Sequence, residues 1–510
     1  MGVAPLWATR LHKGRQLSAD SAYVAAISLA AVSVLCLIVV GVYGASLGLA
    51  ADSDSRVIVV AAERILSGEY VPSRSYGFPL YEGLVAAAFA AGLGVFFLNL
   101  ISLLAALTAV VFAAILARRL GANRIGVSAV VCAVALHPLV LTNSSALMET
   151  SLSLAFSLGF CILALNAFRS PRHGRFNGLG AVAAGVALVL IRPDSVILVA
   201  SVCAALIVIG RRSGDNSQER KGAVLLGAVA GLSALIFYLI NGGLSFLSTD
   251  VLQLEPIGRR WLRAGLGIGN ALQPVGTFVL VMFGARLLQK GEATPTGSQF
   301  PSFRRAFGLV LAIAVPLYLI RFAALPDELE YILVPLVLVF IWALSAAESA
   351  DVVKLVFLAS IAQNIMAVSV FERTWPEGLT IRPAVSIAGV WQDFRLRRDL
   401  LTLNSDDFRR WLAAQAGLDA RTVRFQTYGP GFVSDTCELV ISNSSLYQID
   451  NPRLAAWPRY QSESYARIVA CDASIFPQGG WKVLQPPPIN PVREIYQKGE
   501  KLHCETVIIH

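Results

Sequence analysis

The stretch ADSDSRVIVVAAERILSGEYVPSRSYGFPLYEGL, residues 51–84, follows the first long apolar segment of the chain. It opens with two carboxylates, Asp52 and Asp54, and continues with apolar residues at helical spacing over residues 55–66. Ser67-Gly68 is a helix stop, and the turn-rich residues 72–79 lead into the next apolar segment. Loop 50–82 is long, part helical and rich in acidic, basic and aromatic groups, so we expect it to contain a functional site. We also expect its helix to lie along a membrane surface.

The composition of the whole chain predicts a protein that crosses a membrane many times. Of its 510 residues, 55% are hydrophobic and only 15% are charged, whereas soluble proteins have about 25% charged residues. Several apolar runs approach or exceed the roughly 18 residues that indicate a span. The net charge of +9 does not require a nucleic-acid partner, because basic residues gather in the cytoplasmic loops of membrane proteins. The expected surroundings are a lipid bilayer.

Charge placement orients the predicted spans. Arg10, Lys13 and Arg15 put the N-terminal segment, residues 1–21, in the cytoplasm. The run 25–49 is too long for a signal-peptide core, so we interpret it as a retained helix. Together with this helix, residues 22–371 are expected to contain about eleven all-α spans, which makes the chain a multi-pass protein of the cell inner (plasma) membrane. The expected spans after the first helix are 95–117, 125–141, 150–168, 178–191, 195–210, 222–241, 268–286, 306–320, 331–347 and 353–370.

Residues 83–94 leave two topologies open. The segment is apolar but about twelve residues long, which is short for a membrane span. If Arg118, Arg119 and Arg124 are cytoplasmic, as the charge rule favours, residues 83–94 form a partial or re-entrant helix. If the segment crosses, those arginines lie outside.

The composition changes after residue 371, where charged residues, proline, asparagine and serine increase. Residues 372–510 are expected to form a small extracytoplasmic α/β domain with a helix at 400–418. Short strands are predicted at 424–427, 437–442, 466–470 and 507–509. On the outside, Cys437 and Cys471 could form a disulfide, and free thiols are the alternative.

Ionisable residues collect at the predicted external ends of the spans, where they are costly unless they face a cavity or one another. Solvated helix ends are the plainer interpretation for single acids. The sequence 192–194 (Arg-Pro-Asp) is more specific, because proline breaks a helix and irregular backbone at membrane depth needs protein or water around it. The residues of this face are Asp52, Asp54, Glu82, Glu149, Arg192, Asp194, Arg259, Arg260, Arg321, Asp327, Glu328 and Glu330.

The order of these features resembles the GT-C glycosyltransferases, multi-spanning enzymes that use polyprenyl-phosphate sugars and include the protein mannosyltransferase and aminoarabinose transferase types. The resemblance covers residues 22–371: an acidic first loop, a helix end before GEY (68–70), and a proline-rich turn into the next helix. The later motifs are ARRLG (117–121) leading to HP (137–138), LIRPD (190–194) and PDELEYILVP (326–335). The first loop has Asp-Ser-Asp where many relatives have Asp-Glu, and Glu330 stands where an arginine often occurs.

The resemblance implies inverting transfer of a sugar from a polyprenyl-phosphate donor to an envelope glycan, lipid or protein on the extracytoplasmic face. Asp54 is the candidate base, with Asp52 as its partner or alternative; both aspartates could instead cap a helix. Either could also ligate a divalent cation, Mg²⁺ or Mn²⁺, although no cofactor is certain. The candidate phosphate-binding residues are Arg192, Arg259, Arg260 and Arg321, and the candidate substrate-binding residues are Arg74, Tyr76, Glu82 and Asp194.

Two other functions remain open from the sequence. A lipid or polysaccharide transporter or flippase would use a similar set of spans, although such proteins show internal repeats and polar sites at mid-membrane, and no convincing repeat is present. A catalytically inactive GT-C-like scaffold would use the C-terminal domain to bind envelope partners. A cavity shared by Asp54 and an arginine would favour the enzyme over the scaffold.

Overall fold

The computed structural model describes residues 6–49, 54–73, 77–167, 174–212, 301–324 and 329–369, with scattered positions between 227 and 281 and short segments after residue 371. The chain divides into two compact units. The first, here called the helical unit, comprises Met1–Ala45, Ile58–Val370 and Ala384–Val390. The second unit comprises Ser46–Val57, Phe371–Pro383 and Trp391–His510.

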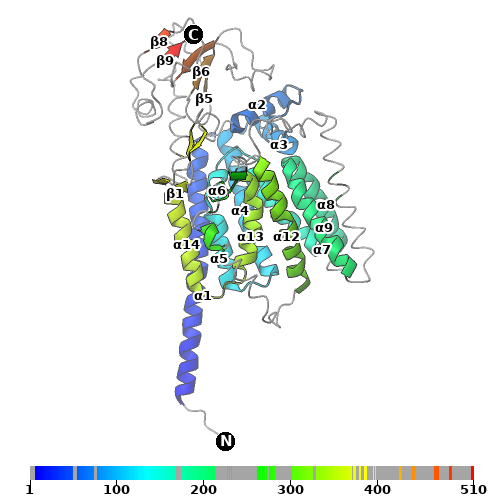
Figure 1. Cartoon of the computed structure of the whole chain (residues 1–510), viewed down its shortest axis with the longest axis vertical. Helices are drawn as coiled ribbons and strands as arrows, with labels where there is room; N and C mark the ends of the chain where they lie inside the picture. Colours follow the sequence, from blue (N-terminus) through cyan, green and yellow to red (C-terminus); the bar gives the residue numbers. More distant parts are fainter. Residues whose placement is uncertain are drawn as a thin grey trace. The chain divides into compact units, whose positions relative to one another are not determined.

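The described helices are shown in Figure 1. In chain order they are α1 (Leu6–Ser46), α2 (Asp54–Leu66), α3 (Pro79–Ala90), α4 (Val95–Arg119), α5 (Arg124–Ala135), α6 (Pro138–Asn143), α7 (Thr150–Ala167), α8 (Gly174–Ile191), the 3-10 turn η1 (Pro193–Ser195), α9 (Val196–Arg212), α12 (Pro301–Ala324), α13 (Glu330–Leu344) and α14 (Ala350–Ile365).

Four of the described helices are long and apolar enough to cross a membrane: Ser21–Ser46, Val95–Arg119, Thr150–Ala167 and Phe303–Ala323. By length and composition these helices fit the expected membrane class of the chain, while the number of about eleven spans and their orientation stay predictions. Helix α3 is only twelve residues long, or about 18 Å at 1.5 Å per residue. That length fits a partial helix better than a full crossing of a core about 30 Å thick.

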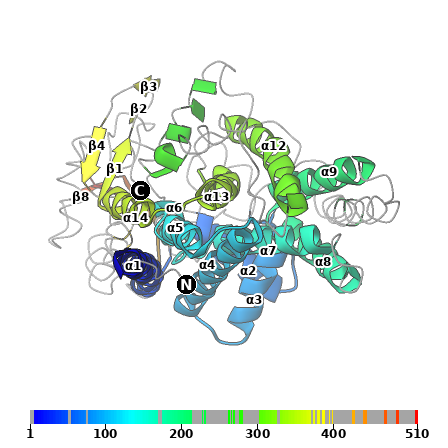
Figure 2. The same cartoon turned by 90° about the horizontal axis from the view of Figure 1, so that it is seen from below.

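Helix α13 lies at the centre of the helical unit. It packs against α4, α5, α7 and α12, and Figure 2 shows it enclosed by its neighbours when the helices are viewed end-on. All of its residues from Tyr331 to Leu344 are buried. A helix that is apolar on every side belongs in the interior of a bundle, and this position brings Tyr331, at its first turn, among the ends of the surrounding helices.

Two expected spans differ from the structure. The span 125–141 is wrong as one helix: α5 ends at Ala135, and α6 begins at Pro138, because proline lacks the amide hydrogen that would continue α5 but suits a helix start. Asn364 of α14 donates to the Leu136 carbonyl at this break, at 2.7 Å. The expected span 353–370 ends earlier, since α14 stops at Ile365 and β1 (Met366–Ser369) pairs antiparallel with β4 (Ala384–Ile387).

The remaining strands pair antiparallel. The strand β2 (Glu372–Thr374) pairs with β3 (Gly378–Thr380), β6 (Glu438–Ser442) lies between β5 (Arg424–Thr427) and β7 (Tyr465–Val469), and β8 (Lys482–Leu484) pairs with β9 (Val507–Ile509). The strands expected at 424–427 and 507–509 coincide with β5 and β9. The strand expected at 437–442 begins one residue later, as β6, and the strand expected at 466–470 is shifted by one residue, as β7. The helix expected at 400–418, Cys437 and Cys471 lie outside the described residues, so the α/β domain and its disulfide stay predictions.

Candidate functional site

The candidate site begins at the break between α8 and α9, which the sequence predicts. Helix α8 ends at Ile191 and Pro193 opens η1, because a proline cannot donate the hydrogen bond that would continue α8. Arg192 between them is extended, with φ −152° and ψ 110°, and its carbonyl accepts from the Ser195 amide at 3.0 Å. The break thus places the Arg192 side chain, which is 4% exposed, among the ends of the neighbouring helices.

Arg192 is held by two carboxylates. Its Nε donates to Asp194 Oδ1 at 3.0 Å, and its Nη1 lies 3.5 Å from Glu149 Oε1. Nη1 also lies 3.4 Å from Thr150 Oγ1, at the start of α7. Since Glu149 is fully buried, each of these charges depends on the others for its stability in a low-dielectric interior.

Two guanidinium groups stack on the ring of Tyr331. The Cζ atoms of Arg192 and Arg321 lie 4.7 Å and 4.4 Å from the ring centroid, within cation–π range. Arg321, in the last turn of α12, also donates through Nη2 to the Tyr331 hydroxyl at 3.2 Å. No ion pair joins Arg321 to a carboxylate of the described residues. Both paired carboxylates of the cluster therefore contact Arg192, and neither forms an ion pair with Arg321.

A small cavity lies beside this cluster. Its volume is about 10 Å³. Its lining residues are Thr150, Ser153, Arg192, Asp194, Ser195, Tyr318, Glu330, Tyr331, Leu333 and Val334. The Tyr318 hydroxyl is buried and has no hydrogen-bond partner among the described residues. That volume is close to the roughly 10–15 Å³ that one water molecule needs, so the cavity has room for about one water molecule and not for a sugar.

Glu82, expected to bind substrate, holds the loop that precedes it. Its fully buried carboxylate accepts hydrogen bonds from the Tyr70 hydroxyl at 2.8 Å, from the Ser73 amide at 2.8 Å and from the Ser73 hydroxyl. Gly77 completes the turn at φ +66°, where an added Cβ would lie 2.6 Å from the Tyr70 hydroxyl oxygen. Substrate binding by Glu82 stays a prediction. The observed contacts join Glu82, which follows Arg74 and Tyr76 in the chain, to Tyr70 and Ser73, which precede them.

The other predicted residues are only partly covered by the structure. Asp54 is the first residue of α2, and the stop expected after Leu66 is confirmed. There Gly68, at φ +87°, and Glu69 donate to the carbonyls of Ile65 and Arg64, the pattern of a Schellman motif.

Five of the predicted site residues lie outside the described residues: Asp52, Arg74, Tyr76, Arg259 and Arg260. The described part of the chain contains no group of three or more histidine, cysteine, aspartate or glutamate side chains that could hold a metal ion. A divalent cation at Asp52 and Asp54 therefore stays a prediction.

Tyr331, Tyr318 and Thr150 are members of the cluster that the sequence analysis did not name as site residues. A signal for Tyr331 is its place directly after Glu330 in the late motif. Tyr318 lies three residues before Arg321, a spacing that puts two side chains on the same helix face. Thr150 has no signal beyond its position next to Glu149.

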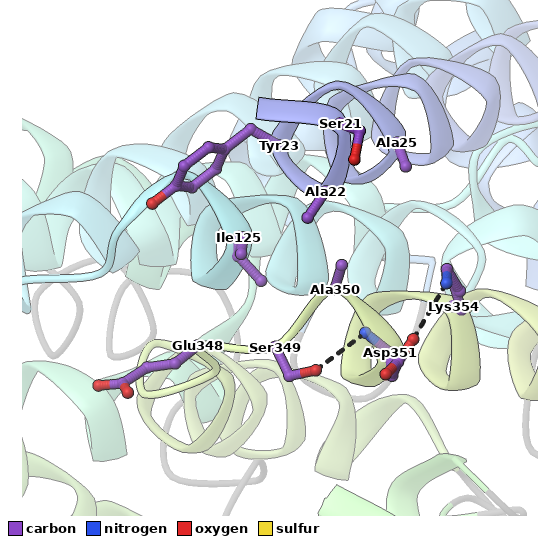
Figure 3. A pocket seen from close by; sticks show the side chains of 10 residues that line it. All are labelled: Ser21, Ala22, Tyr23, Ala25, Ile125, Glu348, Ser349, Ala350, Asp351 and Lys354. Carbon is purple, nitrogen blue, oxygen red and sulfur yellow. Dashed lines mark hydrogen bonds and ion pairs between the residues drawn. The ribbon is translucent and has the colours of Figure 1, made fainter. Parts of the chain in front are cut away.

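A larger cavity, of about 500 Å³, lies at the other end of α13, between α1, α5 and the turn before α14 (Figure 3). Its charged side chains include Glu348, Asp351 and Lys354. The ion pair between Asp351 and Lys354, at 3.0 Å, is exposed and lies within one helix turn, so it is a weak surface contact. None of the predicted site residues lines this cavity, and the cluster around Arg192 and Arg321 remains the candidate site.

Comparisons of the chain with known protein families, with curated proteins and with solved structures find no match.

Proposed function

We propose that the chain is an integral membrane glycosyltransferase of the GT-C type. It moves a sugar from a polyprenyl-phosphate donor to a glycan, lipid or protein acceptor on the extracytoplasmic face of the inner (plasma) membrane. The observation that carries the proposal is Arg321, a half-buried guanidinium that stacks on Tyr331 and pairs with no carboxylate of the described residues. A cation held at a helix end is suited to the phosphate of a lipid-linked donor.

The two arginines of the cluster have different parts in this proposal. Arg192 is already engaged by Glu149 and Asp194, so its main effect is to hold Tyr331 and the break between α8 and α9 in place. Arg321 keeps donors available, and arginine can bind two phosphate oxygens in a bidentate manner. As the bond between sugar and phosphate breaks, negative charge grows on the phosphate, and a preorganised guanidinium stabilises that charge. Arg259 and Arg260 are further candidates for the same phosphate.

The acceptor must lose a proton when its hydroxyl attacks the anomeric carbon, and a carboxylate is a suitable base. Asp54, at the start of α2, and Asp52 are the candidates. Arg74, Tyr76 and Asp194 are proposed substrate contacts. The capping alternative makes a different prediction, because an aspartate that only caps α2 would affect stability rather than turnover.

The test is transfer of radiolabelled sugar from polyprenyl phosphate by the purified chain. Asp54→Asn or Asp52→Asn should abolish turnover while donor binding is kept, and Arg321→Gln should weaken donor binding. Arg118→Gln is the matched control, because Arg118 is an exposed arginine at the end of α4. Undiminished transfer by both aspartate variants would remove the proposed base.

Transport is the second candidate function, and one feature of the helical unit favours it. Among the described helices, the chain is interrupted between α5 and α6 and between α8 and α9. Interrupted helices form substrate sites in many transporters. Movement of a fluorescent polyprenyl-phosphate lipid across proteoliposomes, without any transfer of sugar, would support transport over the enzyme.

A further inference from the structure

The turn that follows α1 is held by an arginine from far along the chain. Arg397 donates through Nη2 to the Gly48 carbonyl at 2.9 Å and through Nε to the Leu49 carbonyl at 3.2 Å. Gly48 adopts the left-handed conformation, with φ +79°, which is how the chain leaves a helix at its C-terminal end. These contacts join two segments about 350 residues apart, directly before the acidic stretch that contains Asp52 and Asp54.

The Arg397 side chain is fully buried, and its Cζ lies 5.9 Å from the ring centroid of Phe394, which is also buried. A guanidinium removed from water is costly unless its N–H groups find acceptors. The two carbonyls supply such acceptors, and the C-terminal end of a helix favours a positive charge. The arrangement therefore constrains the turn more strongly than a solvent-exposed contact would.

A second observation, independent of these hydrogen bonds, points the same way. The segment Ser46–Val57, which covers the end of α1, the acidic stretch and the first turn of α2, groups with Trp391–His510 in the second unit. The chain on either side of that segment belongs to the helical unit. In addition, Ser55, next to Asp54, is fully buried.

From these observations we propose that Arg397 is a positioning residue for the acidic stretch, and that the C-terminal chain is a structural part of the proposed catalytic loop. This role rests on the proposed function, in which Asp54 or Asp52 is the base. Arg397 acts through the backbone of residues 48–49, and it fixes where the stretch leaves α1. The C-terminal chain would thus be needed for turnover even if it binds no substrate of its own.

The first test does not depend on enzymatic activity. Hydrogen exchange is measured in the full-length protein for Arg397→Gln, Arg397→Lys and the exposed control Arg118→Gln. Arg397→Gln should speed amide exchange in residues 46–57 by about tenfold or more, since a local contact that limits opening is lost. Arg397→Lys, which keeps the charge but not the fork of donors, should give a smaller increase. Exchange in α4 should be unchanged in both Arg397 variants, and exchange in residues 46–57 should be unchanged in Arg118→Gln.

Unchanged protection of residues 46–57 in both Arg397 variants would overturn the proposal. So would faster exchange that is spread evenly over α4 and the other helices, because that result would show global destabilisation rather than positioning. If Arg397→Gln does not fold, Arg397→Lys gives the same readout.

Turnover provides the second test and separates this inference from the function on which it rests. In a chain that transfers sugar, Arg397→Gln should lower kcat by about tenfold or more, with the KM for the donor within a factor of about two. A KM that rises while kcat is kept would assign Arg397 to donor binding and overturn its positioning role. If the wild-type chain transfers no sugar, the proposed function fails, while the exchange result still decides whether Arg397 holds the stretch.

Discussion

Replacing Arg192 with methionine should strongly destabilise the chain. The change keeps most of the side-chain volume but leaves the buried carboxylates of Glu149 and Asp194 without the cation that lies 3.5 Å and 3.0 Å away. Breaking a buried ion pair on one side costs about 3–5 kcal/mol, and at 4% exposure Arg192 has little screening by water. We therefore expect the free energy of unfolding to fall by about that amount.

The assay is reversible unfolding of the purified protein in mixed micelles with increasing SDS. Lys354→Met is the matched control, because it removes a cation from the exposed pair with Asp351, and such surface pairs contribute about 0–1 kcal/mol. A double-mutant cycle adds Glu149→Gln. This change removes the stranded carboxylate, so the double variant should be more stable than the sum of the two single losses predicts, by about 0.5–3 kcal/mol. A loss of less than about 1 kcal/mol in Arg192→Met, or strict additivity in the cycle, would refute the account of the cluster.

Three further changes test the fold around the site. Tyr70→Phe removes one of the hydrogen bonds to the Glu82 carboxylate, so trypsin should cut after Arg74 faster than in the wild type. An equal rate of cleavage would show that this hydrogen bond does not hold the loop. Gly126→Ala places a Cβ 3.1 Å from two backbone carbonyl oxygens and should lower the free energy of unfolding by about 1–3 kcal/mol in the SDS assay. The control is Gly83→Ala, whose added Cβ meets nothing within 4 Å; it should leave the free energy of unfolding unchanged or raise it. Asn364→Leu leaves the buried Leu136 carbonyl without the Asn364 amide donor and should lower the free energy of unfolding by about 1–3 kcal/mol in the same assay. A variant as stable as the wild type would show that the break between α5 and α6 does not need this hydrogen bond.

The elements that sequence reasoning predicted well are those that local chemistry determines. The stop of α2 at Gly68 follows from the freedom of glycine at positive φ, and the break after Ile191 follows from Pro193. The same chemistry at Pro138 interrupts the expected span 125–141. That interruption was not predicted, because the apolar run continues through it and hydropathy alone favours one helix.

The contacts of the candidate site are harder to predict, because they depend on how distant helices pack. Arg192 and Arg321 are expected at one membrane face, but their shared contact with the Tyr331 ring depends on how α12 and α13 pack. Similarly, an acid such as Glu82 in the first turn of a helix is favourable by itself. Nothing in its local sequence indicates that loop residues nine and twelve positions earlier donate to it.

The central claim is that Arg321 binds the phosphate of a lipid-linked donor, and equilibrium binding of a radiolabelled polyprenyl-phosphate sugar tests it most directly. Hydrogen bonds to a charged group contribute about 1.5–3 kcal/mol, so Arg321→Gln should raise the Kd by about tenfold or more. Arg321→Lys, which keeps the charge without the bidentate geometry, should raise the Kd less. The control Arg118→Gln should bind the donor as the wild type does. A wild-type Kd in Arg321→Gln would contradict the account.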